Sequence, residues 1–485
     1  MSEKLKKTLS FFLENATTHG ISGIYQMKNI FVKILIMLLF LTLVSFMGYS
    51  LLATFRTFFE YEVYTSVEIE TNHRLQFPAV TICSNNAIPK SYLNSSLLQD
   101  VLNKTNDVVT GKIPFDEINE FFLNLTYELT AKLESSKTTA PKQPPMILET
   151  LNDACLFAQK QRCNLTKDFK PTFPTEILNT CYTFNAGLEN RYVQTGKGSG
   201  FGLSLVMFMN QSDFLPLIGK KRDTGFTVYI HDSDTLPMLG IRGMLVGPGF
   251  HTKIAIRKTE IVAKPSPFPS NCSNGEGIVN YIPGAYTSLA CQLSCVFNSV
   301  LSECGYAQNL IRSHINTTKI IQSNASMLQC RDRVMNAVLG AQTFPCQCPR
   351  ACKEIRYEST MSQSRWPNDI DLPIFKALSQ KVVGVNPSSI TDDFFTKNFL
   401  KLDIYFDDMS VRKYVEKEMM GRISLLSIIG GHLGFWTGSS LFSIFEWLVA
   451  LISLLMLFIQ IMANKFLGER DQSVTKVESI GINPM

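Results

Sequence analysis

The fold of this chain is decided by residues 423–463, which read ISLLSIIGGHLGFWTGSSLFSIFEWLVALISLLMLFIQIMA. The only ionisable side chains in this run are His432 and Glu446. A helix needs about 20 predominantly apolar residues to cross a bilayer, and this run is longer than that. It therefore predicts a membrane-spanning segment.

The first half of this segment is unlike a simple membrane anchor. Ser439 and Ser440 follow an interval that is crowded with glycines, at positions 430, 431, 434 and 438. Small residues let helices approach closely or let backbone carbonyls face a lumen, and an intramembrane carboxylate such as Glu446 indicates a functional site. The alternative interpretation is a glycine-rich packing face with one acid near a helix end.

A second uncharged run sets the topology. Residues 34–55, ILIMLLFLTLVSFMGYSLLATF, contain no charged side chain. They are too long for the core of a signal peptide, and no small-residue cleavage site follows them. Their length and uniform apolarity favour a first membrane helix over a buried helix of a soluble core.

Two spans place both termini on the same side of the membrane. The tail before the first span is rich in lysine, and Lys465 directly follows the second span. Positive charge at these places is typical of the cytoplasmic side. We therefore predict cytoplasmic tails at residues 1–33 and 464–485 and an extracellular domain at residues 56–422, in a multi-pass protein of the plasma membrane.

Glycosylation motifs agree with an extracellular middle region. N-x-S/T triplets, which are acceptors for N-linked glycans in secreted domains, predict modification at Asn94, Asn103, Asn124, Asn164, Asn210, Asn316 and Asn324. A further triplet begins at Asn271 and has Cys272 in its middle.

All 12 cysteines lie between positions 83 and 352, inside the same region. An even number of cysteines in one oxidising compartment predicts six disulfides. A zinc site is a weaker interpretation, because no Cys or His pairs stand at zinc-like spacing around Cys346 and Cys348.

The spacing of the later cysteines suggests how they pair. Cys291 and Cys295 lie on one face of a helix, and Cys346 and Cys348 point the same way from an extended segment. A helix joined to a returning strand by nested bridges satisfies both spacings, although sequence alone does not prove a connectivity. The inferred pairs are Cys83–Cys181, Cys155–Cys163, Cys272–Cys352, Cys291–Cys348, Cys295–Cys346 and Cys304–Cys330.

Several stretches of the extracellular region predict strands, because β-branched and aromatic residues gather between turn signals. These are residues 77–83 (FPAVTIC), 202–209, 226–231, 252–261 and 399–408. Apolar spacing predicts helices in residues 91–133, with loop breaks, and in residues 367–383. Residues 55–70 are expected to be extended.

Composition and motifs argue against several other functions. The net charge of +5 over 485 residues is too slight and dispersed to indicate nucleic-acid binding. Residues 196–202, GKGSGFG, precede a strand and do not open a helix, so a tight turn is favoured over a phosphate-binding loop. No nucleophile–base pair, metal site or cofactor loop has credible context, so we predict neither an enzyme nor a cofactor.

In this order, the motifs of the chain resemble the degenerin/epithelial sodium channel superfamily, which includes acid-sensing and peptide-gated channels. The motifs that carry the resemblance are His19-Gly20, FPAVTIC at 77–83, CYTFN at 181–185, GSGFGLSL at 198–205, VGPGF at 246–250, CQCPRAC at 346–352, Trp366-Pro367 and GGHLGFWTGSS at 430–440. The resemblance covers nearly the whole chain.

The resemblance implies a trimeric membrane protein with two transmembrane helices and a large mixed α/β, disulfide-rich ectodomain. Its palm, thumb, finger and knuckle regions would include a thumb at about residues 272–380, formed by the disulfide-linked helix pair. The second span, residues 423–463, would be broken where unwound backbone lines water.

The resemblance also implies roles for individual residues. Gly438, Ser439 and Ser440 match the selectivity filter, and Glu446 would form a lower ring of negative charge that favours cations. His19 and Gly20 match a gating motif beneath the pore. The outer pore would include Ser427, Ile428 and Gly431, with Ser427 at the position where bulky side chains hold such channels open.

The expected function is therefore a sodium-selective, amiloride-blocked channel formed by a homo- or heterotrimer in contact with membrane lipid. Lys220, Lys221 and Arg222 stand where acid-sensing members are acidic, and Val63 stands where they have a histidine. These differences disfavour proton gating and favour an extracellular ligand such as a neuropeptide.

Other interpretations stay open at this point. Proton-gated, constitutive or mechanically gated opening would fit the same architecture. A two-span scavenger or adhesion receptor would share the topology, but it has no need for a Gly/Ser break and a carboxylate in its second span. An ATP-gated two-span channel would need phosphate-binding lysines beside the membrane-proximal strands, and no such set is seen.

Overall fold

The computed structural model describes residues 3–18, 20–86, 90, 93, 95–114, 120–121, 123–125, 127–128, 146–147, 153–172, 181–187, 192–214, 223–235, 237, 242–278, 282, 284–305, 324–340, 346–379 and 391–477. The chain divides into two compact units. One combines Met1–Tyr64 with Glu418–Met485, and the other is Thr65–Lys417.

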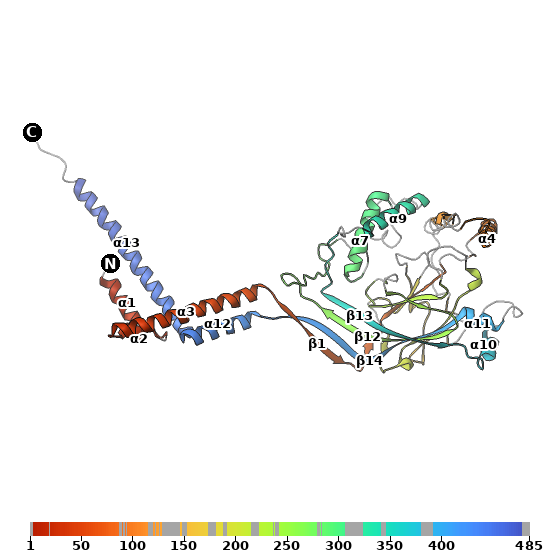
Figure 1. Cartoon of the computed structure of the whole chain (residues 1–485), viewed down its shortest axis with the longest axis horizontal. Helices are drawn as coiled ribbons and strands as arrows, with labels where there is room; N and C mark the ends of the chain where they lie inside the picture. The colour runs from red at the N-terminus through yellow and green to blue at the C-terminus, as the bar shows by residue number, and fades with distance from the viewer. Residues whose placement is uncertain are drawn as a thin grey trace, which may run out of the picture. The chain divides into compact units, whose positions relative to one another are not determined.

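The first unit is helical. It contains α1 (Glu3–Asn15), α2 (Ile21–Gln26), α3 (Ile30–Phe59), α12 (Arg422–Thr437) and α13 (Leu441–Val477). In Figure 1, α3 and α12 run side by side, and α13 leaves α12 at an angle. The long run predicted from sequence is therefore two helices with a break between them.

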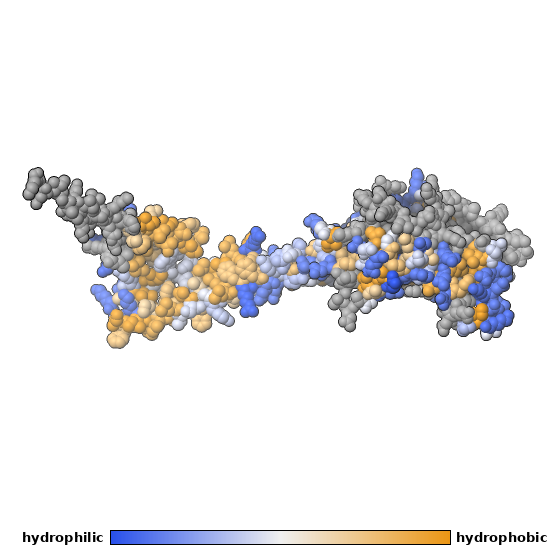
Figure 2. All heavy atoms as spheres, turned by 90° about the horizontal axis from the view of Figure 1, so that it is seen from above, coloured by the Kyte–Doolittle hydropathy of each residue, from blue (hydrophilic) through white to orange (hydrophobic). Residues whose placement is uncertain are grey.

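Two stretches of this unit are long and apolar enough to cross a membrane, Ile30–Phe59 and Leu441–Gln460. No residue of α3 is buried within the chain. The outward-facing apolar side chains form an orange surface in Figure 2, as expected for a unit whose solvent is lipid. Asn29 extends α3 beyond the predicted 34–55, because its side chain caps the helix by accepting from the Phe31 N–H at 3.1 Å.

The second unit is built on two sheets. The larger has the order β13 (Lys353–Arg365), β12 (Phe250–Val262), β14 (Phe399–Glu418), β9 (Leu203–Phe208), β4 (Cys155–Phe157) and β5 (Gln161–Arg162), and β1 (Val63–Thr71) also pairs with β14. The smaller has the order β11 (Met244–Val246), β10 (Phe226–His231), β3 (Ala79–Ser84), β7 (Cys181–Phe184) and β6 (Phe169–Thr172). A separate pair joins β2 (Leu75–Gln76) to β8 (Val193–Gln194).

The core lies between these strands. Its side chains come from both sheets, and several of the largest have no exposed surface, including Phe77, Phe184 and Phe406. The ring of Phe77 packs edge-on against those of Phe184 and Phe406, at 6.3 and 6.1 Å between centroids. Aromatic side chains of this size dominate the burial that holds such a core together.

The second unit also contains helices outside the two sheets. They are α4 (Ser95–Val109), α7 (Ser288–Cys304), α9 (Ala325–Leu339), α10 (Leu372–Ser379) and α11 (Asp392–Asn398), with 3-10 turns η2 (Ser199–Phe201) and η3 (Gln211–Asp213). The Thr287 hydroxyl caps α7 by accepting from the Ala290 N–H at 3.0 Å. Gly305 ends α7 in the left-handed conformation, with φ of 62°.

Six disulfides link the second unit, and they join the same six pairs that the spacing suggested. Two bridges tie α7 to residues 346–348, and the Cys304–Cys330 bridge ties α7 to α9. The returning segment is not a strand, because β13 begins only at Lys353. Pro349 interrupts the segment and has no N–H to donate to a ladder.

The predicted strands overlap β3, β9, β10, β12 and β14; β3 ends one residue later than expected, β12 is longer at both ends, and β14 continues to Glu418. Two expectations need correction. Residues 55–70 are not extended throughout, because α3 continues to Phe59 before β1 begins at Val63. The helix expected at 367–383 begins only at Leu372, as α10, and residues 380–383 lie outside the described residues.

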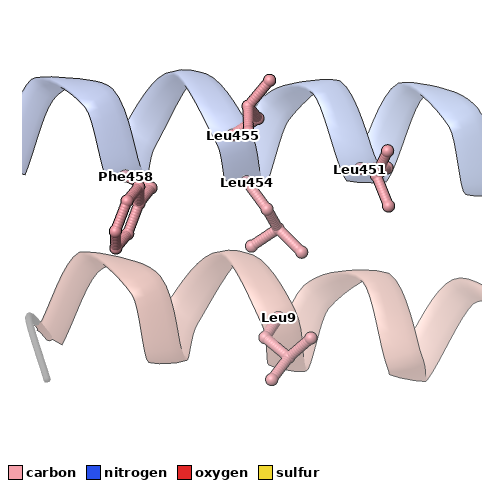
Figure 3. Close-up of a pocket in the computed structure, with 5 residues that line it drawn as sticks. All are labelled: Leu9, Leu451, Leu454, Leu455 and Phe458. Carbon is pink, nitrogen blue, oxygen red and sulfur yellow. The ribbon is translucent and has the colours of Figure 1, made fainter.

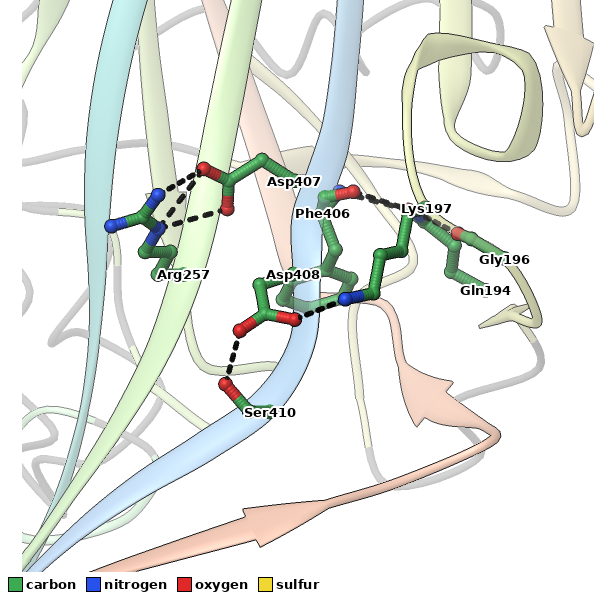
Figure 4. A network of polar contacts seen from close by, with 8 residues as sticks. All are labelled: Gln194, Gly196, Lys197, Arg257, Phe406, Asp407, Asp408 and Ser410. Carbon is green, nitrogen blue, oxygen red and sulfur yellow. Dashed lines mark hydrogen bonds and ion pairs between the residues drawn. The ribbon is translucent and has the colours of Figure 1, made fainter.

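A bulge interrupts β14, the strand that leads toward the second membrane segment. Ile256 pairs with Phe406, and Lys258 pairs with Val411, so residues 407–410 have only Arg257 opposite them. The Gln194 amide bonds to both backbone groups of Phe406, accepting from its N–H at 3.0 Å and donating to its carbonyl at 3.1 Å. Figure 4 shows this contact with the neighbouring ion pairs.

Ion pairs hold the bulge. Arg257 donates to Asp407 at 2.7 to 3.0 Å, and the Lys197 ammonium lies 2.7 Å from Asp408 (Figure 4). The hydrogen bond from Lys197, with one from Ser410, lowers the pKa of Asp408 to about 2. Asp408 therefore stays ionised throughout the physiological pH range.

His231 is a buried titratable group at the end of β10, with 4% of its surface exposed. Its Nδ1–H donates to the Asp232 carbonyl at 2.9 Å, so the neutral ring accepts at Nε2 from the Thr81 hydroxyl at 2.8 Å. Tyr229 stacks on the ring at 5.1 Å. Burial lowers the pKa of His231 to about 4.

The lowered pKa predicts acid destabilisation. The pKa of His231 in the folded protein lies below its ordinary value of 6.5. The stability that the neutral, buried ring contributes is therefore complete above pH 6.5 and is lost as the pH falls toward 4. A shift of this size corresponds to on the order of 3 kcal/mol. We expect the melting temperature of the full-length protein in detergent to fall less between these pH values in His231→Gln than in the unmodified chain. Parallel curves for the two proteins would contradict this.

Candidate functional site

The candidate site begins where α12 ends. Gly438 adopts the left-handed conformation, with φ of 61° and ψ of 19°. Its N–H donates to the Gly434 carbonyl at 3.0 Å, and the Ser439 N–H donates to the Leu433 carbonyl at 3.2 Å. A residue without Cβ is favoured here because side chains crowd the backbone in this conformation.

Hydroxyl groups line the break. The Thr437 hydroxyl donates to the Leu433 carbonyl at 2.7 Å and also lies 2.7 Å from the Ser439 hydroxyl. Ser440 and Ser443 then cap α13 reciprocally, because each hydroxyl accepts from the other residue's N–H, at 3.3 and 3.2 Å. The result is unwound backbone flanked by hydroxyls between two apolar helices. Within a membrane such backbone is tolerated only against water or protein.

Four small residues form a stripe along α12 that leads to this break. Ser427, Gly431, Gly434 and Gly438 recur at helical spacing, and no other atom lies within 4 Å of a Cβ built on Gly431 or Gly434. Ser427 is exposed, and its hydroxyl bonds only back to the Ile423 carbonyl, at 3.0 Å. Among the described residues, the stripe at Gly431 and Gly434 leaves room for another helix to approach closely.

The opposite face of α12 contacts α3. His432 Nε2 lies 3.5 Å from the Thr54 hydroxyl, and Trp436 stacks on Phe46 at 5.8 Å. His432 and Trp436 stand four residues apart and so share one helix face. Ile428 lies on this side of the helix, and 36% of its surface is exposed.

Below the break, Glu446 is held by the N-terminal segment. Its Oε2 accepts from the Thr17 N–H at 3.2 Å and from the Thr17 hydroxyl at 2.7 Å. The Thr17 hydroxyl also lies 2.9 Å from that of Ser443, which is 2% exposed. The structure therefore brings Glu446 together with residues that are more than 400 positions away in sequence.

The same N-terminal segment is anchored on both sides of Thr17. The Trp447 indole N–H donates to the Thr18 hydroxyl at 2.9 Å, and the Phe12 ring meets the Trp447 ring edge-on at 4.7 Å. Gly20 has φ of 93°, a left-handed value that turns the chain into α2. His19, the other predicted gating residue, lies outside the described residues.

Leu9 of α1 packs over α13 in an apolar groove lined by Leu451, Leu454, Leu455 and Phe458. Figure 3 shows Leu9 on α1 and the four other lining residues on the neighbouring α13. The lining is hydrocarbon, so this groove fixes α1 against α13 and offers no polar group for recognition.

The predicted glycosylation positions are partly described. Asn103, Asn124, Asn164, Asn210 and Asn324 are exposed in the structure. Asn94 and Asn316 lie outside the described residues. N-glycosylation at these positions stays a prediction.

Sequence reasoning did not find Thr17, Ser443 or Trp447. The S-x-x-S spacing of Ser440 and Ser443 is a capping signal that could have been recognised. Nothing in the local sequence links Thr17 to Glu446, because that contact depends on how α1 lies on α13.

Comparison with known proteins gives a consistent picture. The family model described as "Amiloride-sensitive sodium channel" matches residues 12–450. Acid-sensing ion channel 1C of Danio rerio is 26% identical over 461 residues, covering 90% of this chain and 82% of its own length. Epithelial sodium channel subunit beta of Bos taurus is 26% identical over 341 residues, covering 68% of this chain and 51% of its own length.

Another similar protein is acid-sensing ion channel 1 of Gallus gallus, which is 26% identical over 465 residues. The alignment covers 90% of this chain and 82% of that protein. A solved proton-activated chloride channel aligns with a TM-score of 0.33 at 8% identity, covering 88% of this chain and 100% of that chain. That score is too low to carry an argument.

Proposed function

The chain belongs to the amiloride-sensitive sodium channel family, whose members form trimeric, amiloride-sensitive sodium channels of the plasma membrane, and we propose that an extracellular ligand such as a neuropeptide opens the channel that this chain forms. The observation that carries the pore assignment is the left-handed break at Gly438 between two apolar helices. Such a break is useful in a membrane only if its backbone faces water or protein.

Three copies of this break would form the selectivity filter. The carbonyl of Gly438 and the hydroxyls of Ser439 and Ser440 offer oxygen atoms to a partly dehydrated sodium ion. The small-residue stripe through Ser427 and Gly431 supports close approach of the three α12 helices above the filter.

Glu446 would form a ring of negative charge below the filter. We expect Glu446→Gln to lower both the sodium-over-potassium permeability ratio and the single-channel conductance, because the ring no longer concentrates cations. Bi-ionic reversal potentials and single-channel recordings measure the two quantities. Glu14→Gln, an exposed acid on α1, is the matched control and should leave both unaltered. Unchanged selectivity and conductance in Glu446→Gln would rule out the ring.

Two ectodomain groups are poor candidates for a proton sensor, because the Lys197 hydrogen bond lowers the pKa of Asp408 to about 2 and burial lowers that of His231 to about 4. The basic tract of Lys220, Lys221 and Arg222 lies outside the described residues. The case that it makes against proton gating therefore rests on sequence alone.

Proton gating is the second candidate, because several similar proteins are named acid-sensing ion channels. Expression in oocytes under voltage clamp separates the two. A neuropeptide library applied at neutral pH should evoke an amiloride-blocked sodium current, and a step to about pH 5 alone should not. Current evoked by the acid step alone would overturn ligand gating and establish proton gating instead.

A further inference from the structure

A continuous chain of hydrogen bonds joins the filter region to Glu446 through the N-terminal segment. The Glu446 carboxylate can only accept, so the Thr17 hydroxyl commits its hydrogen to Oε2, at 2.7 Å. The Ser443 hydroxyl must then donate to Thr17, at 2.9 Å, and it accepts in turn from the Ser440 N–H, at 3.2 Å. The carboxylate thus sets the direction of the two bonds made by the Thr17 hydroxyl, and the Ser440 N–H can only donate.

This chain is built into a docked segment. Ala16 and Thr18, on either side of Thr17, are 9% and 6% exposed. The Trp447 indole N–H holds Thr18, so the segment stays in place independently of the Thr17 hydroxyl. Removing that hydroxyl should therefore loosen the carboxylate, which keeps only the bond from the Thr17 N–H, without releasing the segment.

The chain uses only one oxygen of the carboxylate. Oε2 takes both donors from Thr17, whereas Oε1 has no hydrogen-bond partner among the residues that the structure describes. Two charge-assisted bonds to one oxygen restrict the rotation of the side chain.

We propose that Thr17 is a positioning residue for ion selectivity, which holds the Glu446 carboxylate at a defined place and couples it to the filter through Ser443 and Ser440. The inference rests on the proposed role of Glu446 in the lower pore. Thr17 contacts the carboxylate, and it acts on the ion through that group.

The test uses the full-length chain in oocytes, on the Ser427→Phe background so that no ligand is needed. Thr17→Val removes the hydroxyl at nearly constant shape, and Thr17→Ser restores it. A hydrogen bond to a charged group typically stabilises its geometry on the order of tenfold or more. We expect Thr17→Val to shift the sodium-over-potassium permeability ratio toward that of Glu446→Gln, and Thr17→Ser to keep the unmodified ratio.

Two further variants make the outcome specific. The double variant of Thr17→Val with Glu446→Gln should show no shift beyond that of Glu446→Gln alone. Thr42→Val, on the exposed surface of α3, removes a hydroxyl that bonds only its own helix and should leave the ratio unchanged. If Thr17→Val does not reach the cell surface, the smaller Thr17→Ala gives the same comparison.

The outcomes separate this inference from the proposed function. An unmodified ratio in Thr17→Val, together with an altered ratio in Glu446→Gln, overturns the role of Thr17 and leaves the lower ring intact. An unmodified ratio in Glu446→Gln overturns both. A shift in Thr17→Val that persists in full on the Glu446→Gln background also overturns the inference, because the hydroxyl would then act by another route.

Discussion

Replacing Ser427 by phenylalanine is expected to produce a sustained, amiloride-blocked sodium current in the absence of any ligand. Ser427 is exposed on the small-residue stripe of α12, and its hydroxyl bonds only to its own helix. Three α12 helices can close the pore only if this stripe allows them to approach. A phenyl ring at this position keeps the helices apart, so the closed arrangement loses its packing while the open one does not.

Two-electrode voltage clamp measures this current directly, with amiloride added at the end of each recording. Leu426→Phe is the matched control, because Leu426 is 71% exposed and is rotated by about 100° from Ser427 around the helix. It adds an aromatic ring beside the stripe and should give no ligand-free current. A silent Ser427→Phe channel that is present at the cell surface would count against the channel assignment itself.

Replacing Gly438 by valine is expected to abolish sodium-selective current without preventing the protein from reaching the surface. Gly438 has φ of 61°, and a left-handed backbone costs an L-residue roughly 1–2 kcal/mol. The cost is larger for a β-branched side chain, for which this conformation is an outlier. The backbone is therefore expected to relax locally, which removes the geometry that presents its carbonyl.

Gly430→Ala is the control for this substitution. Gly430 lies inside α12 and outside the four stripe residues, and no described atom beyond the neighbouring helix backbone lies within 4 Å of a Cβ built at this position. Alanine is favoured over glycine in a helix by roughly 1 kcal/mol, so the helix should be retained. Surface biotinylation and reversal potentials measure the two effects separately. Normal selectivity in Gly438→Val would show that the left-handed break does not select the ion.

Both predictions depend on features that are local in sequence. The stripe from Ser427 to Gly438 follows helical spacing, and glycine is the residue that most readily adopts a left-handed conformation. The strands could be predicted for the same reason, because β-branched and aromatic residues cluster where β3, β9, β10 and β12 form. The cysteine spacing likewise anticipated the two bridges that join α7 to Cys346 and Cys348.

Other features were hidden because they depend on distant parts of the chain. The bulge of β14 at residues 407–410 exists because Gln194, Lys197 and Arg257 bind it from other segments. The local alternation of apolar and polar residues predicts a strand there and does not indicate the extra residues of the bulge. The lowered pKa of His231 similarly follows from burial among neighbours that only the folded sheet supplies.

The sequence by itself determined the two membrane spans from hydropathy and the oxidised ectodomain from the number and placement of its cysteines. The break at Gly438 was expected from the resemblance to the channel superfamily. Only the tertiary structure decided that Thr17 binds Glu446 and that Ser443 connects them to Ser440. Contacts across more than 400 residues arise from packing of whole helices, and no local pattern encodes which side chains will meet.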